Sequence, residues 1–252
     1  MAAPVVRPKH LLILGGTGEA AALARQAVNR PGLKVTTSLA GETRTPARLK
    51  GAVRSGGFGG ADGMADYLRQ ARVDLVVDAT HPFAAVISHN AAKACSAVGL
   101  AHVHLVRPPW ERQEGDTWID VDDLIQAAQE VAGRRAFLTI GRVELGRFAE
   151  VENTWFLVRV IDPPAQPPPL ANCRVIQGRP PFTVETERAL MADHKIDVVV
   201  SKNSGGASTY AKIAAARALG LPVVMVRRPP PPNGPVVASV EETLAWLTEH
   251  QA

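Results

Sequence analysis

Residues 10–21 read HLLILGGTGEAA, and this stretch decides the fold. The apolar run that ends at Leu14 predicts a short buried strand, which passes through glycines into an alanine-rich helix over 20–28. Gly16, Gly18 and Ala21 match the G-x-G-x-x-G/A fingerprint, in which a glycine turn lets a dinucleotide's pyrophosphate approach the N–H groups of a helix start. An ordinary tight turn between a strand and a helix would show similar residues, so the motif needs support from the rest of the chain.

The predicted contacts of the pyrophosphate are the five residues of this turn, Gly15, Gly16, Thr17, Gly18 and Glu19. Glu19 does not fit a phosphate-binding turn well. Its carboxylate suits the positive end of the helix dipole, but it repels a phosphate group at the same place.

The composition is that of an ordinary globular enzyme. A chain of 252 residues with 46% hydrophobic and 21% charged residues can form one large domain or two small ones. No apolar run approaches the roughly 20 residues of a membrane span, and the first residues lack the apolar segment of a signal peptide. Cys95 and Cys173 follow no metal-binding spacing. We therefore expect a cytoplasmic protein with reduced thiols, no membrane contact and no metal site.

The net charge of +4 indicates an acidic partner. Lys and Arg are dispersed, and no basic run is interleaved with aromatic residues as in many nucleic-acid-binding surfaces. An acidic small molecule accounts for the same excess. The net charge alone does not distinguish a nucleic acid from an acidic small molecule as the partner.

Short aliphatic runs alternate with alanine-rich helical stretches along the chain, the pattern of an α/β protein. Continuous apolar runs such as 75–77 indicate parallel strands that are covered on both faces. The predicted strands cover 10–14, 33–38, 52–55, 73–78, 102–106, 135–140, 155–161, 174–177, 196–201 and 222–226.

The two halves of the chain contain a similar pattern of strand, helix and Gly-Leu pair. The strand over 73–78 leads through an alanine-rich helix to Gly99-Leu100, and the strand over 196–201 leads through another to Gly220-Leu221. This shared pattern predicts two Rossmann-like open parallel-sheet domains with a ligand cleft between them. We place the boundary near Ala132-Gly133, with a dinucleotide-binding domain over 1–132 and a substrate-binding domain over 133–252.

In open parallel sheets, ligands bind beyond the carboxyl ends of the strands. After the second strand, Ser38 and Arg44 fit the 2′-phosphate of NADP, and Glu42 is the counter-candidate for the 2′-hydroxyl of NAD. Because Glu42 lies well past the predicted strand end, NADPH/NADP is favoured as the cofactor. The remaining predicted cofactor contacts follow the third and fourth strands; they are Gly57, Phe58 and Thr80.

Two titratable residues at predicted strand ends, His81 and Lys202, are the candidate catalytic residues. His81 could donate a proton or stiffen its loop, and both interpretations stay open. Lys202 begins the second glycine turn, KNSGG over 202–206, which groups a cation, an amide, a hydroxyl and backbone donors into a predicted anion site. A capped helix whose glycines relieve strain explains the same residues equally well.

Two enzyme classes are disfavoured by missing motifs. Short-chain dehydrogenases need a Tyr followed four residues later by Lys, but Tyr67 and Tyr210 are followed there by Ala71 and Ala214. The sequence also lacks the Gly-Lys-Ser/Thr that follows the glycine turn of a P-loop NTPase.

Seven motifs occur in order along the chain: LGGTGEA at 14–20, TSLAG at 37–41, GGFGG at 56–60, DATHPFA at 78–84, LVRPPW at 105–110, TIGR at 139–142 and SKNSGG at 201–206. Together they resemble the precorrin-6A reductases of cobalamin biosynthesis, over a stretch from about His10 to Arg228. One departure concerns the cofactor. The family often carries Arg directly after the glycine equivalent to Gly41, where this chain has Glu42, with Arg44 two places later.

The resemblance implies an oxidoreductase that uses NADPH to reduce one carbon–carbon double bond of the precorrin-6A macrocycle, giving precorrin-6B. This substrate is an acidic tetrapyrrole with acetate and propionate side chains, which suits a basic protein. Its predicted contacts are Arg107, Arg142, Lys202, Asn203, Ser204, Gly205 and Gly206. The resemblance implies neither nucleic acid nor membrane as a partner, and it is compatible with transient contact with neighbouring pathway enzymes.

Two alternatives stay open from the sequence. One is a sibling enzyme that reduces the cobalt-containing macrocycle with NADH. The other is a non-catalytic dinucleotide-binding module that senses redox state, in which the second glycine turn and His81 would have no task.

Overall fold

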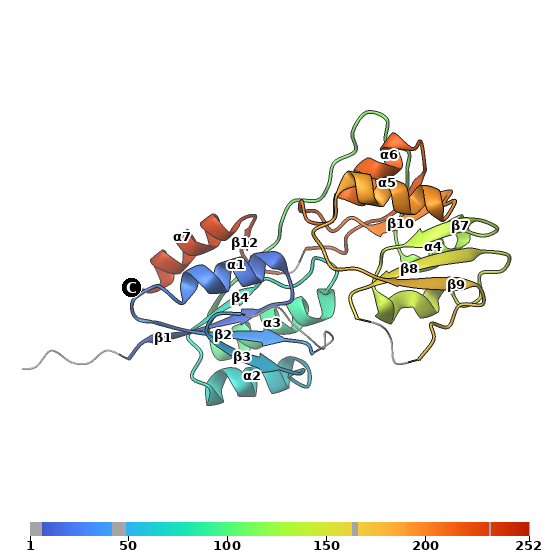
Figure 1. The fold of residues 1–252 in the computed structure, drawn as a ribbon. Coiled ribbons are helices and arrows are strands. Elements are labelled where there is room, and N and C mark those ends of the chain that lie inside the picture. The colour runs from blue at the N-terminus through green and yellow to red at the C-terminus, as the bar shows by residue number, and fades with distance from the viewer. Residues whose placement is uncertain (1–6, 42–48, 163–165, 232, 252) are drawn as a thin grey trace, which may run out of the picture. The chain divides into compact units, whose positions relative to one another are not determined.

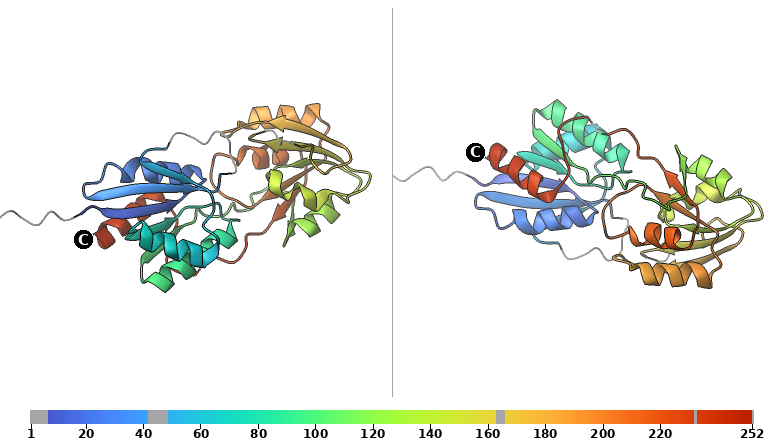
Figure 2. Two further views of the ribbon diagram at one scale, coloured as in Figure 1. Left: turned by 90° about the horizontal axis from the view of Figure 1, so that it is seen from below. Right: turned by 90° about the horizontal axis from the view of Figure 1, so that it is seen from above.

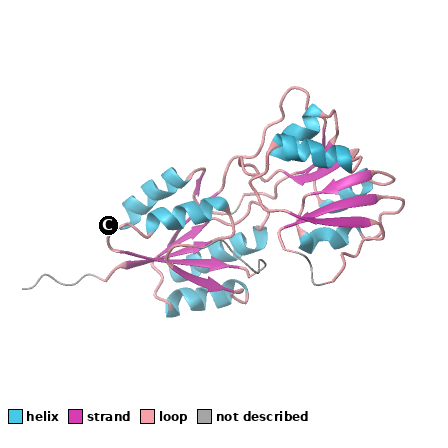
Figure 3. Cartoon of the chain, viewed as in Figure 1, coloured by secondary structure: helices cyan, strands magenta, loops and turns pink. Residues whose placement is uncertain are grey.

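The computed structural model describes residues 7–41, 49–162, 166–231 and 233–251. They belong to two compact units, the first formed by 1–107 with 229–252 and the second by 108–228. Each unit holds one six-stranded sheet, and helices alternate with the strands along the chain (Figures 1 and 3). Neighbouring strands are parallel in both sheets, which confirms the predicted α/β class with two open parallel sheets. The ligand cleft expected between the two halves stays a prediction.

The first sheet has the strand order β12-β5-β4-β1-β2-β3. Its strands are β1 (Lys9–Leu14), β2 (Leu33–Leu39), β3 (Ala52–Ser55), β4 (Leu75–Asp78), β5 (Ala101–Leu105) and β12 (Val236–Val237). The helices of this unit are α1 (Gly18–Ala27), α2 (Gly60–Gln70), α3 (Ala85–Val98) and α7 (Val240–Gln251).

The second sheet has the order β6-β11-β10-β7-β8-β9. Its strands are β6 (Trp118–Val121), β7 (Arg135–Leu138), β8 (Trp155–Val160), β9 (Cys173–Gln177), β10 (Val198–Lys202) and β11 (Val223–Val226). The helices of this unit are α4 (Leu124–Glu130), the 3₁₀ helix η1 (Arg142–Phe148), α5 (Val184–Asp193) and α6 (Ala211–Ala218).

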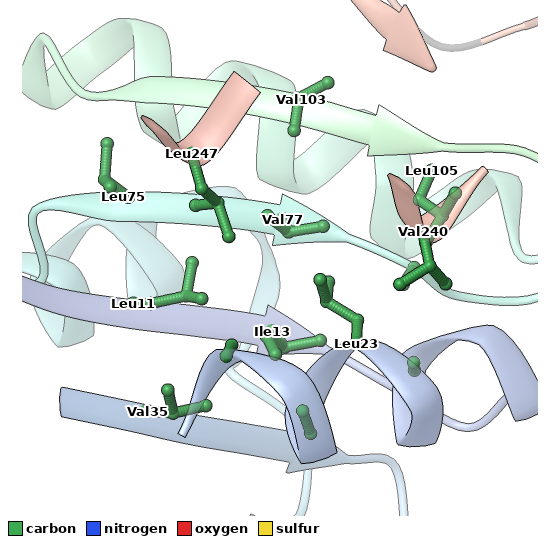
Figure 4. Close-up of a cluster of buried hydrophobic side chains, with 14 residues drawn as sticks. Leu11, Ile13, Leu23, Val35, Leu75, Val77, Val103, Leu105, Val240 and Leu247 are labelled. Atoms are coloured by element: carbon green, nitrogen blue, oxygen red, sulfur yellow. The ribbon is translucent and has the colours of Figure 1, made fainter. Parts of the chain in front are cut away.

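The core of the first unit follows from the alternation of side chains along β1. Leu11 and Ile13 point to one face of the sheet and pack with α1 and α7, whereas Leu12 and Leu14 point to the other face and pack with α2 and α3. Figure 4 shows the first of these clusters, with Leu247 of α7 among the strand residues. Because both faces are covered, the strand reads as a continuous apolar run rather than an alternating one.

The domain boundary expected at 132/133 is wrong, because it falls between α4 and β7, inside the second unit. The chain enters the second unit already at Pro108, and β6 joins the second sheet by pairing with β11. At Pro229 the chain returns to the first unit, where β12 pairs with β5 and α7 packs near α1 (Figure 2). The periodicity of a sequence shows that a strand exists, but it does not show which sheet the strand joins.

All ten predicted strands have counterparts in the structure, and every strand end lies within two residues of its predicted position. The two strands that the sequence did not reveal, β6 and β12, both lie at sheet edges. An edge strand has one neighbour, so it needs few apolar residues. β6 carries Asp120 in its centre, and β12 has only two residues just after a proline-rich stretch.

We predict that α7 is an integral part of the first unit although it is the last element of the chain. Leu247 is 0% exposed within the first core cluster. Leu247→Ala should therefore lower the free energy of unfolding by about 2–5 kcal/mol, measured by chemical denaturation. Glu249→Ala, at an exposed position of the same helix, is the control and should change it by less than about 0.5 kcal/mol. Equal, small effects of both variants would contradict the docking of α7.

Candidate functional site

The glycine turn after β1 divides its tasks among its residues. Gly15 donates its N–H to the carbonyl of Ser38 at 2.9 Å, and a Cβ at Gly15 would lie 2.9 Å from Cγ2 of Thr37, so this glycine lets β1 pack against β2. Gly16 has a φ of +116°, which favours glycine. Apart from the neighbouring residues and the backbone of α1 itself, a Cβ built at Gly16 or at Gly18 would meet no described atom within 4 Å. The turn is therefore tight on its sheet side and open above Gly16 and Gly18.

The Thr17 hydroxyl stabilises this turn through two hydrogen bonds. Its Oγ1 accepts a hydrogen bond from the N–H of Ala20 at 3.1 Å and so caps α1. The same hydroxyl donates to the carbonyl of Ala79 at 2.7 Å, just beyond the end of β4. The glycine turn and the loop that begins at Thr80 are thus fixed to each other.

Arg107 resolves the difficulty that Glu19 presents in the sequence. Its guanidinium pairs with the carboxylate of Glu19 at 2.7 Å, so the negative charge at the start of α1 is balanced. Arg107 was expected among the substrate contacts, and the structure places it in the first unit beside the glycine turn. Because Arg107 balances the charge of Glu19, the open backbone above Gly16 and Gly18 and the N–H groups of α1 fit a pyrophosphate.

Beside the end of β2 lies an arginine of β3, Arg54, that no sequence motif singles out. Nη1 of Arg54, in β3, donates to Oγ of Ser38 at 2.7 Å and to the carbonyl of Gly56 at 3.0 Å. Nη2 donates to the carbonyl of Gly57 at 2.9 Å, and the guanidinium lies 3.9 Å from the centre of the Phe58 ring. Arg54 thereby brings three of the predicted cofactor contacts, Ser38, Gly57 and Phe58, to one place.

A pairing register is the signal that would have revealed Arg54. Ser38 and Arg54 are direct partners across β2 and β3, so their side chains leave the same face of the sheet. Register between strands distant in sequence is not visible in a single sequence. Arg44 and Glu42, the residues expected to distinguish NADP from NAD, lie outside the described residues.

Asp78, at the end of β4, is the centre of a buried polar network. Its Oδ1 accepts hydrogen bonds from the N–H of Thr80 at 3.0 Å and from the hydroxyl of Thr80 at 2.6 Å. Its Oδ2 faces Nδ1 of His104 at 3.0 Å, and Nε2 of His104 faces the carbonyl of Asn233 at 3.0 Å. The carboxylate therefore fixes the Thr80 loop and, through His104, the segment that precedes β12.

The network also keeps Asp78 ionised. Burial alone opposes the charged form, but hydrogen bonds from His104, Ser88 and Thr80 outweigh it and hold the pKa of Asp78 below its ordinary value. The nearby Cys95 experiences the opposite balance. Burial, together with the charge of Asp78, raises the pKa of the Cys95 thiol to about 12, so this cysteine stays a neutral core residue.

His81 lies in the loop after Thr80 and is half-buried. Its Nδ1 accepts a hydrogen bond from the N–H of Phe83 at 3.3 Å, and its carbonyl accepts one from the N–H of Ala84 at 2.7 Å. With Nδ1 as the acceptor, a neutral imidazole carries its proton on Nε2. The contact with Phe83 supports the loop-stiffening role and is equally compatible with a proton donor, so both hypotheses stay predictions.

In the second unit, Lys202 ends β10 and pairs with Glu144 of η1. Arg142, another predicted substrate contact, begins the same 3₁₀ helix. The two predicted cations of this unit are therefore linked by η1: Arg142 is its first residue, and Lys202 pairs with Glu144 of the same helix.

The rest of the second glycine turn packs against the segment before β6. The Asn203 side chain accepts from the N–H of Trp110 at 2.8 Å and donates to its carbonyl at 3.0 Å. The indole of Trp110 donates to the carbonyl of Gly206 at 2.8 Å, and a Cβ at Gly205 would lie 2.0 Å from the carbonyl oxygen of Pro108. Asn203, Gly205 and Gly206 thus have a structural task, and Ser204 is buried beside them. Their expected contact with substrate stays a prediction.

Two features are absent from the described residues. These residues contain no cluster of His, Cys, Asp or Glu that could hold a metal ion. Their helices also lack the combination of length and hydrophobicity that a bilayer span requires.

A family model described as precorrin-6x reductase CbiJ/CobK matches residues 10–248 of this chain. The chain belongs to this family. It is 50% identical to the precorrin-6A reductase of Rhodococcus erythropolis, over 94% of this chain and 97% of the relative. It is 30% identical to the cobalt-precorrin-6A reductase of Priestia megaterium, over the same shares of the two chains.

The fold of this chain also agrees with a solved structure of a protein named for the same activity. A solved structure named CobK precorrin-6A reductase superposes with a TM-score of 0.92 at 41% sequence identity, covering 97% of this chain and 98% of that one. The glycine turn, the Thr80 loop and the Lys202 turn therefore lie in the architecture of the CbiJ/CobK family.

We predict that the ionised Asp78 stabilises the first unit. Asp78→Asn should lower the free energy of unfolding by about 3–5 kcal/mol near pH 7, because it breaks a buried, hydrogen-bonded pair. The folded-state pKa of Asp78 is depressed, so its contribution is present above the ordinary value of about 3.9 and is lost as the pH falls further. The gap between wild type and variant should therefore shrink below about pH 4.

Denaturation curves at several pH values check this prediction. Asp66→Asn removes the same charge at an exposed position of α2 and should change the stability little at any pH. A gap that stays constant down to about pH 3 would show that Asp78 is not the ionised group.

Proposed function

We propose that this protein reduces one carbon–carbon double bond of the precorrin-6A macrocycle with NADPH and releases precorrin-6B. Membership of the CbiJ/CobK family carries this proposal. The open glycine turn after β1, with Glu19 balanced by Arg107, supports the dinucleotide part of it. The identity with a relative named for the metal-free substrate is 50%, against 30% with one named for the cobalt form, and this favours the metal-free macrocycle.

The first unit is the proposed cofactor side. The backbone of Gly16, Thr17 and Gly18 and the first N–H groups of α1 would hold the pyrophosphate. Ser38, with Arg44 as first expected, would lie near the 2′-phosphate. When bound, NADPH supplies a hydride to one carbon of the double bond, and the neighbouring carbon takes a proton from a side chain or from water.

The second unit is the proposed substrate side. Lys202 and Arg142 are cations at the carboxyl ends of β10 and β7, the strand ends where open sheets bind ligands. Their charges suit the carboxylates of a tetrapyrrole. Because Lys202 already pairs with Glu144, its ammonium is held in place before a substrate carboxylate arrives.

Mixing the purified protein with NADPH and precorrin-6A tests the proposal directly. We expect loss of the NADPH absorbance together with a change in the macrocycle spectrum, and a much slower reaction with NADH. NADPH binding without any spectral change would instead support the redox-sensing module. Faster reaction with NADH on the cobalt-containing macrocycle would support the sibling enzyme.

For His81 we predict a role as the proton donor. His81→Ala and His81→Asn should then both lower kcat by about 10²–10⁴-fold, with a smaller effect on KM. The asparagine variant separates the two hypotheses, because its side-chain oxygen can still accept the Phe83 N–H that stiffens the loop.

The control is His89→Ala, at an exposed position of α3, which should leave turnover unchanged. Near-normal turnover of His81→Asn, with an unchanged pH profile, would make His81 a loop residue and water the proton donor.

For Lys202 we predict a role in tetrapyrrole binding. Lys202→Ala should weaken binding of the macrocycle by roughly 10–100-fold, because a charge-assisted contact is lost and Glu144 is left facing the substrate carboxylates. NADPH binding, measured by its fluorescence, should stay intact. Arg188→Ala removes one exposed positive charge from the same unit and serves as the control. A collapse of NADPH affinity in Lys202→Ala would show that the two units have been assigned the wrong ligands.

A further inference from the structure

Arg54 is one of the described arginines that pair with no described carboxylate. Carboxylates pair with seven others: Arg7, Arg69, Arg107, Arg112, Arg159, Arg217 and Arg227. Arg54 makes no ion pair with any described carboxylate; its hydrogen bonds go to one hydroxyl and two carbonyls. Within the described residues, no carboxylate therefore balances its positive charge at the carboxyl edge of the first sheet.

The guanidinium is also held rigidly. The rings of Phe58 and Tyr67 lie 3.9 and 4.9 Å from it, and the three hydrogen bonds fix its plane. A guanidinium has five N–H donors, so two remain beyond these contacts with the described residues. A half-buried, preoriented cation with spare donors is a group suited to an anion.

The position of Arg54 says which part of an anionic ligand it would meet. Dinucleotide-binding sheets recognise the ribose 2′ group at the end of the second strand, with an acid for NAD and an arginine for NADP. In this chain β2 ends at Leu39, and the preceding residue, Ser38, is buried and accepts a hydrogen bond from Arg54. The next three residues, Leu39, Ala40 and Gly41, offer no acid.

We propose that Arg54 is a specificity-determining residue, whose guanidinium binds the 2′-phosphate of the adenosine half of NADPH. The proposal rests on the proposed dinucleotide cofactor and extends it, because it names a cation in β3 where the sequence pointed only to Arg44. The hydrogen bond from Arg54 to Ser38 also orients the Ser38 hydroxyl. Since Nη1 donates to the Ser38 oxygen, the hydroxyl is oriented to donate its own proton elsewhere.

Binding of two adenosine fragments, measured by calorimetry on the full chain, tests this proposal. One fragment, 2′,5′-ADP, carries the 2′-phosphate, and the other, 5′-ADP, lacks it. Arg54→Gln should weaken binding of 2′,5′-ADP by roughly 10–100-fold and that of 5′-ADP by less than about threefold. Arg69→Gln, which removes the same charge from an exposed position of α2, is the matched control and should change neither affinity.

Arg54→Lys keeps the charge but loses the planar fork, so it should recover part of the preference for 2′,5′-ADP. It also replaces Arg54→Gln if that variant does not fold. Equal losses for both fragments would overturn the proposal and make Arg54 a purely structural residue. An undiminished preference in the Arg54 variants, lost instead in Arg44→Gln, would also overturn it.

These outcomes differ from failure of the proposed function. The fragments bind without precorrin-6A and without turnover, so the test does not depend on the reduction. If the wild-type protein binds neither fragment, the dinucleotide cofactor itself is wrong. If it prefers 2′,5′-ADP while Arg54→Gln keeps that preference, the cofactor stands and only the role of Arg54 fails.

Discussion

The parallel register of the first sheet places Leu14 between Asp78 on β4 and Ser38 on β2, and the rest of the candidate site depends on that row. The same row of paired residues continues to His104 on β5 and to Arg54 on β3. Parallel strands end at a common edge of the sheet. The pairing register therefore brings the glycine turn, the carboxylate of Asp78 and the guanidinium of Arg54 to this same carboxyl edge. A slip of one residue would turn each of these side chains to the opposite face.

Charge balance is the second feature that shapes the site. Glu19 at the start of α1 is paired with Arg107, Lys202 is paired with Glu144, and the buried Asp78 faces His104. Each pair holds a charged side chain in one orientation before any ligand arrives. Arg54 stands apart from these pairs, since neutral acceptors and aromatic rings position it and no carboxylate among the described residues pairs with it.

The two glycine turns look alike in the sequence but do different physical work. Gly16 and Gly18 have open space where a Cβ would lie, which suits the approach of a ligand. Gly205 has the carbonyl of Pro108 there instead, so its lack of a side chain serves the packing of the segment that contains Trp110. A glycine in a sequence marks a place where something comes close to the backbone. Only the fold tells whether that neighbour is a ligand or the chain itself.

The α/β class, ten of the strands, the glycine turn and the family can all be predicted from the sequence, because buried parallel strands, helix starts and motifs consist of contiguous residues. The three-dimensional fold was needed to show that β6 belongs to the second sheet, that β12 and α7 return to the first, and that Arg107 balances Glu19. The hydrogen bond between Arg54 and Ser38 and the Asp78–His104 pair also became visible only in the fold. These features join residues that are distant along the chain, and their pairing is set by strand register and packing, which local patterns do not encode.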